Sequence, residues 1–518
     1  MAHKNLFRSI PGKLIPAADA RNAEGAKAYA YEPKHKLAQV AATGCFGATY
    51  YASAGAQLEA ILELANRVEP LFVARTALYA RERGHMKDMP ALLCAVLAAK
   101  APGVLAEVFE RVIDNGKMLR TFVQMLRSGV AGRKSLGTLP KRLVLRWLAN
   151  RSDEAIFKAS VGASPSLADV VKMVHPKPAT PAREALYGYL LNKAHDAAAL
   201  PELVRAYEAF KRGESRAVPA VPFELLTALE LDTQAWQGIA RHAGWQMTRM
   251  NLNTFLRHGV FKDRELTERI AQRLRDPDEI RRAKAFPYQL MVAHAQAHAE
   301  VPHAVRMALL DAMDRALANV PAFEGRVAVC PDVSGSMSSA VTGARPGATS
   351  VVRCIDVAAL IAAAILRQNP SARVIPFETD VVKVKLNARD TVLTNAEKLA
   401  KIGGGGTNCS APLKLLARER AEADLVIYVS DNQSWVDGQA GGRGTGLMAE
   451  WTAFKQRNPK AKLVCIDLQP YGTTQAQERA DILNVGGFSD HVFEVLDAFH
   501  RDRFSGAHWV EVIEQVTW

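Results

Sequence analysis

The spacing of apolar residues changes once along this chain, near Pro321, and this change limits the folds that the chain can adopt. From about residue 55 to 320, apolar residues recur three and four positions apart, as on one face of a helix. After Pro321, short runs rich in β-branched residues alternate with helical patterns. An all-helical part therefore precedes an α/β part. The length of 518 residues agrees with a division into at least two domains, because one hydrophobic core rarely grows this large.

The helical part carries the helical spacing in the stretches 56–84, 89–116 and 139–151, which are separated by glycine and proline. Short helices with short connections and no strand signal predict an α-solenoid of HEAT-like helical repeats. The segment GESRAVPAVP (213–222) predicts a loop between two helical pairs.

The α/β part predicts a doubly wound, mostly parallel sheet. Expected strands are 326–330, 372–377, 381–386, 424–430 and 462–467, and expected helices are 354–368, 395–402, 411–421 and 446–457. The predicted organisation is an N-terminal segment (1–40) that packs on the domains, a helical domain (41–320) and an α/β domain (321–518).

Three loops of the α/β part carry oxygen ligands. The motif DVSGSM places Asp332, Ser334 and Ser336 after the first strand. Thr407 follows a run of glycines, and Asp431 follows the strand 424–430. Ligands bind beyond the carboxyl ends of the strands in such sheets, so these loops should meet. Two carboxylates and three hydroxyls are hard donors that suit Mg²⁺ or Mn²⁺.

Positive charge is concentrated in the helical part. The chain has a net charge of +13, and counting along the sequence gives +14 for residues 1–320 and −1 for 321–518. The stretch 117–151 has nine Lys or Arg residues and no Asp or Glu. A surface with one sign of charge indicates a polyanionic ligand.

Other classes fit the sequence less well. No run of apolar residues is long enough to span a membrane, and the N-terminus lacks a signal-peptide pattern, so we expect a cytoplasmic protein. The six cysteines form no CxxC pair, which favours reduced thiols. The glycine loop lacks the lysine of a phosphate-binding loop, and no histidine lies near the three oxygen-bearing loops. We therefore expect no catalytic residues and no enzymatic activity.

Several further stretches are distinctive: TGCFGATYYAS (43–53), LGTLPKRLVLRWLA (136–149), SLADVVKMVHPKP (166–178), MNLNTFLRHGVF (250–261), AKAFPYQLMVAHAQAHAE (283–300) and the loops DVSGSM, GGGGTNCS and VSDNQSW. With these stretches the chain resembles the Ro autoantigen family, whose members join a TROVE module to a von Willebrand factor A domain. The three loops resemble a metal-ion-dependent adhesion site, with Asp332, Ser334, Ser336, Thr407 and Asp431 as its ligands.

The resemblance implies a helical ring joined by the A domain. It implies that the protein binds Y RNA on the basic outer surface and single-stranded 3′ ends of misfolded RNAs in the central hole. It also implies RNA quality control beside an exonuclease such as polynucleotide phosphorylase, or beside an RNA-ligase repair system. We expect a monomer, since a chain that closes on itself needs no second copy.

The resemblance also suggests RNA-binding residues. They are Lys141, Arg142 and Arg146 on one basic helix, Lys158, Lys172, His175 and Lys177 around the 166–178 motif, and Arg257 further along. Vertebrate members have an arginine four positions after the lysine matched by Lys158, and this chain has Gly162 there. Lys172 or Lys177 is expected to compensate.

Two alternatives remain from the sequence. The chain is a protein-interaction scaffold if the adhesion-type site captures an acidic partner, and it is a metal-dependent nuclease if the metal acts on RNA. The glycine-rich segments 340–350 and 436–446 flank the metal motif and are expected to gate it or to be ordinary loops.

Overall fold

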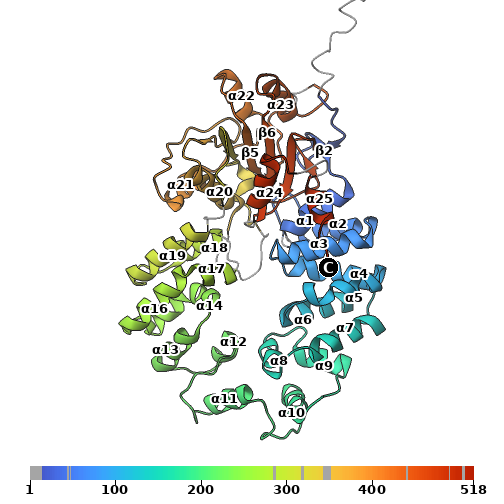
Figure 1. Ribbon diagram of the computed structural model, residues 1–518, viewed down its shortest axis with the longest axis vertical. Helices are drawn as coiled ribbons and strands as arrows, with labels where there is room; N and C mark the ends of the chain where they lie inside the picture. The colour runs from blue at the N-terminus through green and yellow to red at the C-terminus, as the bar shows by residue number, and fades with distance from the viewer. Residues whose placement is uncertain are drawn as a thin grey trace, which may run out of the picture.

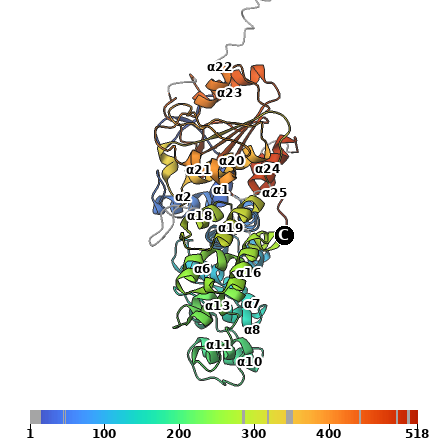
Figure 2. The same cartoon turned by 90° about the vertical axis from the view of Figure 1, so that its left-hand side faces the viewer.

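This computed structural model describes residues 15–43, 46, 48–283, 287–316, 320–341, 352–438, 442–488, 491–503 and 508–518. Figure 1 shows helices running away from a sheet domain along one arm and returning along the other. Seen edge-on in Figure 2, the two arms project onto each other below the sheet domain. In the described ranges, no helix is long and apolar enough to cross a membrane.

The first arm begins at the sheet domain and ends at the far side of the array. It contains α1 (Pro33–Thr43), α2 (Ala54–Arg67), α3 (Pro70–Glu82), α4 (Asp88–Lys100), α5 (Pro102–Val112), α6 (Gly116–Arg127), α7 (Thr138–Ala149), α8 (Asp153–Ala159), α9 (Leu167–Val174) and α10 (Pro181–Leu190). The predicted loop 213–222 lies further along the chain, between residues 211 and 223, and contains no helix or strand.

The second arm returns to the sheet domain. It contains α11 (Glu202–Lys211), α12 (Phe223–Leu226), α13 (Thr233–His242), α14 (Trp245–Met250), α15 (Leu252–Arg257), the short 3-10 helix η3 (Val260–Lys262), α16 (Arg264–Arg275), α17 (Pro277–Ala283), α18 (Pro287–Gln296) and α19 (His303–Ala316). The predicted helical array is confirmed. Closure of a ring around a central channel stays a prediction.

The sheet domain is doubly wound, as predicted. Its strands are β3 (Val327–Pro331), β4 (Arg373–Val374), β5 (Leu425–Ser430), β6 (Lys462–Asp467) and β8 (Ile482–Gly486), in the order β4-β3-β5-β6-β8. All their pairings are parallel. The helices are α20 (Cys354–Gln368), α21 (Val392–Ala400), α22 (Ala411–Arg418), α23 (Gly446–Arg457), α24 (His491–His500) and α25 (His508–Glu514).

Both faces of the sheet are buried, which explains the continuous apolar strands. In β5, Leu425, Ile427 and Val429 join the core that includes α20 and the helical arms, whereas Val426 and Tyr428 join the core that includes α22 and α23. Side chains alternate between the faces because a strand has a period of two.

The expected strand at 381–386 is wrong. Val381 forms only an isolated antiparallel bridge with Phe377, and no ladder continues from it. Val382, Val384 and Leu386 nevertheless pack on the core. The alternating apolar residues therefore place one side of this segment on the core. The described backbone of the segment does not pair with β4 as a further strand of the sheet.

The ends of the helical array and the N-terminal segment contact the sheet domain. Strands β1 (Ala20–Arg21) and β2 (Lys27–Ala30) form a three-stranded sheet with β7 (Thr473–Thr474), with the order β1-β2-β7. Helix α1 contacts β8 and α25, and α18 contacts α20. The sheet domain thus touches the beginning and the end of the helical array.

Candidate functional site

The loops predicted to carry the metal ligands meet at the carboxyl edge of the sheet. Strand β3 lies between β4 and β5, so the chain order reverses at the β3–β5 boundary. Asp332 directly follows β3, and Asp431 directly follows β5. Ligands of doubly wound sheets bind at such a reversal point.

The hydroxyl ligands are connected by hydrogen bonds. The Thr407 hydroxyl donates to Ser334 Oγ at 2.9 Å, and the Oγ atoms of Ser334 and Ser336 are 3.4 Å apart. The Ser334 backbone N–H donates to Asp332 Oδ1 at 2.9 Å. Asp431 interacts with Asp332 and Ser336, so the predicted set of five residues is gathered in one cluster. We call it the oxygen cluster: Asp332, Ser334, Ser336, Thr407 and Asp431.

Glycine allows the loop before Thr407 to approach its neighbours. Gly405 has φ +71°, and a Cβ on Gly406 would lie 2.6 Å from the Trp435 ring. The Thr407 carbonyl accepts hydrogen bonds from the N–H groups of Trp435 and Val436, at 3.0 and 3.1 Å. These contacts hold Thr407 beside the loop that carries Asp431.

The oxygen cluster is buried and electrostatically unfavourable by itself. Its five residues are between 0% and 5% exposed. Burial and then the charge of Asp332 raise the pKa of Asp431 to about 7, and burial raises the pKa of Asp332. Asp431 Oδ2 has no hydrogen-bond partner among the described residues. Hard oxygen donors with an unpartnered carboxylate oxygen fit a divalent cation.

The described ranges contain no group of three or more His, Cys, Asp and Glu side chains arranged to hold a metal. The oxygen cluster differs from such a group, because three of its five donors are hydroxyls.

Sequence reasoning missed two groups beside the oxygen cluster. Ser430 donates a hydrogen bond to Asp332 Oδ2 at 2.6 Å. Asp467 ends β6 in register with Ser430, and neither of its carboxylate oxygens has a partner of good geometry in the described structure. Burial and the charge of Asp431 raise its pKa well above the usual value. The signal was a third aspartate at the end of a predicted strand.

The predicted RNA-binding residues lie on both arms of the helical array. Lys141, Arg142 and Arg146 lie on α7, Lys158 lies in the last turn of α8, and Lys172 lies on α9. His175 caps the C-terminus of α9 in the left-handed conformation, with φ 51°, and Lys177 follows it. Arg257 ends α15 in the other arm and donates to the Thr254 hydroxyl at 3.4 Å.

Lys158 instead lies in a cavity with three cations of the basic stretch. The cavity has a volume of about 510 Å³, and Lys117, Arg120, Arg151 and Lys158 line it. Two carboxylates line the same cavity: Asp114, which pairs with Arg81, and Glu224, which lies with Pro222 at the start of α12 in the other arm. None of the four cations forms an ion pair with a carboxylate in the described part of the chain. We call this the basic cavity.

Arg120 offers a guanidinium beside Gly162. A Cβ on Gly162 would lie 2.2 Å from Arg120 Nη1, and Gly162 has φ +104°. The positive φ disfavours an L-residue at position 162, because only glycine adopts this backbone conformation without strain. The structure thus places the Arg120 guanidinium of α6 beside position 162, and the compensation by Lys172 or Lys177 stays a prediction.

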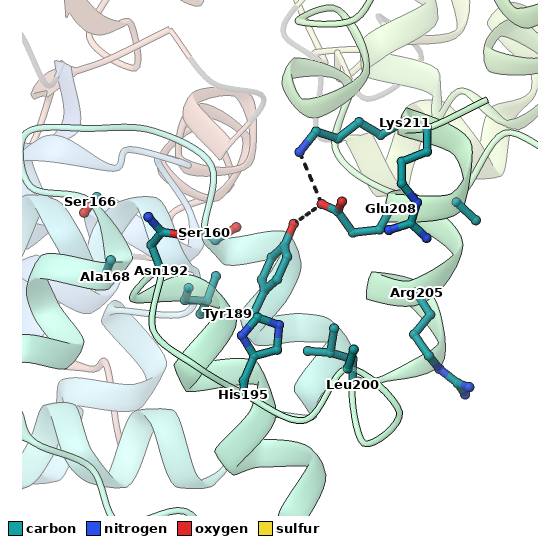
Figure 3. A pocket seen from close by; sticks show the side chains of 14 residues that line it. Ser160, Ser166, Ala168, Tyr189, Asn192, His195, Leu200, Arg205, Glu208 and Lys211 are labelled. Atoms are coloured by element: carbon teal, nitrogen blue, oxygen red, sulfur yellow. Dashed lines mark hydrogen bonds and ion pairs between the residues drawn. The ribbon is translucent and has the colours of Figure 1, made fainter. Parts of the chain in front are cut away.

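A larger cavity of about 930 Å³ lies between the helices α8 to α11. Figure 3 shows Tyr189 at its centre, with His195 beside it and Glu208 across from it. The Tyr189 hydroxyl donates to Glu208 Oε1 at 2.6 Å, and Lys211 pairs with the same oxygen at 3.4 Å. Arg205 also lines this cavity, exposed and without a carboxylate partner in the described residues.

Some predictions fall partly outside the described residues. Residues 342–350 of the 340–350 segment and 439–441 of the 436–446 segment are among them, as is Cys45. The other five cysteines are buried and form no disulfide in the described part of the chain.

A doubly wound domain with this hydroxyl and carboxylate cluster, joined to a helical array, is the architecture of a von Willebrand A domain attached to a TROVE-type module. Comparisons with known proteins agree. Residues 326–500 match the family model of the Ro60 vWA domain, and residues 224–329 match that of the TROVE domain. The two matches together span more than half of the chain, and the chain belongs to the Ro family.

Individual relatives extend the match. The chain is 26% identical over 546 aligned residues to a protein of Deinococcus radiodurans named RNA-binding protein RO60, covering 96% of this chain and 99% of that one. It is 22% identical to a protein of the same name from Caenorhabditis elegans, over 46% of this chain and 37% of that one. The crystal structure of the Deinococcus radiodurans RO (RSR) protein superposes with a TM-score of 0.62 at 22% identity, covering 91% of this chain and 100% of that one. The structural likeness shows the shared fold.

Proposed function

We propose that this protein binds RNA, and that the basic cavity is a principal contact. The observation that carries the proposal is the convergence of Lys117, Arg120, Arg151 and Lys158 on one concavity without carboxylate partners in the described residues. Unpaired cations attract phosphates and release counterions when they bind. The names of the relatives support the same function.

The proposed ligands are structured small RNAs of the Y RNA type and single-stranded 3′ ends of misfolded RNA. The basic cavity is lined by residues of both arms, so a strand that enters it would be held between them. Single strands bind best where cations track the backbone and rings can stack on bases. Tyr189, His195 and Arg205 of the larger cavity provide such groups on neighbouring helices.

We propose a binding role in RNA quality control, in which cleavage or repair is performed by a partner. The class of partner is an exonuclease such as polynucleotide phosphorylase, or an RNA-ligase repair system. The oxygen cluster supports a binding role because it has no neighbouring imidazole base within its hydrogen-bonded set.

We also propose that the oxygen cluster holds Mg²⁺ or Mn²⁺. Such a cation would neutralise the two carboxylates when bound. Asp332 and Asp431 would supply the charge, and the three hydroxyls would complete an all-oxygen set. The position of Ser334, fixed by Thr407 and by its own N–H bond to Asp332, keeps these donors in place before a cation arrives.

A salt-dependent binding titration tests the RNA proposal. A hairpin RNA with a single-stranded 3′ tail and the same hairpin with a blunt end are titrated with the full-length protein by fluorescence anisotropy. We expect tighter binding of the tailed RNA and a steep loss of affinity with salt. Equal and weak binding of both RNAs at low salt would overturn the proposal.

A further inference from the structure

Residues 48–52 connect the oxygen cluster to the helical array. They directly precede Ser53, which caps α2 by accepting a hydrogen bond from the Ala56 N–H at 3.2 Å. The Thr49 N–H donates to the Ala52 carbonyl at 2.9 Å, and Gln57 of α2 donates to the Thr49 hydroxyl at 3.3 Å. The turn is therefore fixed to α2. We call residues 48–52 the strap.

Tyr51 of the strap lies against the oxygen cluster. Its hydroxyl lies within reach of the side chains of Ser336 and Glu24, and its pKa is raised by burial and then by the negative charge of Asp431. Its ring packs edge to face on Tyr471, with 5.2 Å between the ring centroids and 89° between the planes. Tyr51 thus contacts one proposed metal ligand and lies within the field of another.

Tyr471 extends the same contact to the chain that follows the DVSGSM motif. The Tyr471 hydroxyl donates to Gln469 Oε1 at 3.0 Å. Gln469 Oε1 also accepts from the Ser339 hydroxyl at 2.9 Å, and Gln469 Nε2 donates to the Ala340 carbonyl at 2.6 Å. The strap, the loop after β6 and the metal-motif loop are therefore connected through direct contacts.

We propose that the metal site links two parts of the protein, and we call this link the clasp. Tyr51 contacts the site from the side of the helical array, and metal binding strengthens the docking of the strap and α2 on the sheet domain. This inference rests on the proposed metal site. It assigns to Tyr51 a positioning role that the sequence motif alone does not indicate.

Burial supports a clasp over an open adhesion surface. All five proposed ligands are at most 5% exposed, and Tyr51 lies beside Ser336 and within the field of Asp431. An acidic group from a partner protein would therefore have to displace some of the groups that bury these ligands before it could reach the cation. A cation that orders Ser336 and Asp431 would also fix the atoms that Tyr51 touches.

Hydrogen exchange of the full-length protein tests the clasp. Amide exchange in peptides that cover residues 48–57 is measured by mass spectrometry with and without Mn²⁺, and Mn²⁺ binding is measured in parallel by calorimetry. The variant is Tyr51→Phe, which keeps the ring and removes the hydroxyl. The matched control is Tyr50→Phe, because Tyr50 is 56% exposed and its ring contacts Tyr51 rather than the cluster.

We expect Mn²⁺ to slow exchange at 48–57 by about fivefold in the unmodified protein and in Tyr50→Phe, the size of effect that one hydrogen bond gives. In Tyr51→Phe, Mn²⁺ should still bind, because the five ligands are intact, but the slowing should be lost. If Mn²⁺ binds and exchange at 48–57 does not change, or if Tyr51→Phe behaves like the unmodified protein, the clasp is wrong and the metal site stands. If the unmodified protein binds no Mn²⁺, the metal site itself is wrong, and the clasp falls with it.

Discussion

Arg146 on α7 forms an ion pair with Glu110 on α5, with 2.7 Å between Nε and Oε1. Asn150 also donates to this carboxylate, at 3.1 and 3.2 Å. A cation that the sequence places on the RNA surface is therefore already neutralised by a neighbouring helix. Arg146 thus differs from the four cations of the basic cavity, which have no carboxylate partner in the described residues and are available to a ligand.

Removal of charge from the basic cavity should weaken RNA binding more than removal of Arg146. We expect the double variant Lys117→Ala/Lys158→Ala to lower the affinity for the tailed hairpin by about tenfold or more at low salt. The plot of log affinity against log salt concentration should become less steep by about 1.4, because each of the two lost contacts to a single strand contributes about 0.7 to the slope. Arg146→Ala should change the affinity by about twofold or less. Fluorescence anisotropy over a salt series measures all of these.

The matched control for this experiment removes two lysines from the sheet domain. Lys414 and Lys460 are both exposed, so Lys414→Ala/Lys460→Ala subtracts the same charge at a distance from the cavity. An equal loss of affinity in the control would show that net charge, rather than the cavity, governs binding.

The close approach of α6 and α8 should be needed for both folding and RNA binding. A Cβ on Gly116 would lie 2.4 Å from Ala159 Cβ, next to Lys117 and Lys158. We expect Gly116→Ala to destabilise the protein by about 1–3 kcal/mol, as overpacking of a core does, and to weaken RNA binding because it separates the two lysines. Thermal unfolding and anisotropy measure the two effects.

Gly103→Ala is the control for this substitution. Gly103 lies in the first turn of α5, as Gly116 does in α6, but nothing lies within 4 Å of an added Cβ. The control should be neutral or slightly stabilising, because alanine restricts the unfolded chain. A destabilised Gly103→Ala alongside a neutral Gly116→Ala would contradict the packing argument.

The affinity for Mn²⁺ should rise with pH up to about 7. The pKa of Asp431 is raised to about 7 by burial and by Asp332, whereas an aspartate in the unfolded chain ionises near pH 4. The cation competes with the proton, so affinity should increase by up to about tenfold per pH unit from 5 to 7 and level off above. Calorimetry at four pH values measures this, and Asp431→Asn should lose the dependence together with most of the binding.

The metal-free protein should show the opposite trend. Between about pH 4 and 7 the folded state keeps a proton on Asp431 that the unfolded chain has released, so stability falls as pH rises through this window. Added Mn²⁺ should offset the fall. Urea unfolding of the chelator-treated protein at pH 5 and 7 measures the free energy of unfolding. If the unmodified protein becomes more stable from pH 5 to 7 and Asp431→Ala does not, the raised pKa of Asp431 is wrong.

Asp332→Asn should separate the metal site from RNA binding. The substitution removes one of two neighbouring buried charges, so the metal-free protein should unfold at a temperature a few degrees higher at pH 8. Stabilisation by Mn²⁺ should be lost, and the affinity for the tailed hairpin should be unchanged. Asp380→Asn, at an exposed position of the same domain, is the control. Loss of RNA binding in a folded Asp332→Asn protein would place the metal within the RNA-binding mechanism.

The sequence by itself determined where the oxygen ligands lie. Asp332 and Asp431 directly follow buried strands, and the carboxyl ends of parallel strands meet at one edge of a sheet, so their proximity was predictable from local patterns. The helical array was predictable for the same reason, because apolar spacing is a local property. The segment 381–386 shows the limit of this reasoning: its alternation fits a strand, but strand formation also needs a partner backbone in register.

Only the tertiary structure decided which charged and polar groups are engaged. The pairing of Arg146 with Glu110, the guanidinium of Arg120 beside Gly162 and the position of Tyr51 on the oxygen cluster each join elements that are not neighbours in the sequence. Such contacts depend on how helices and domains pack, and a local pattern does not encode that packing. The sequence therefore specified the set of candidate ligands, whereas the fold determined which of them are free to bind.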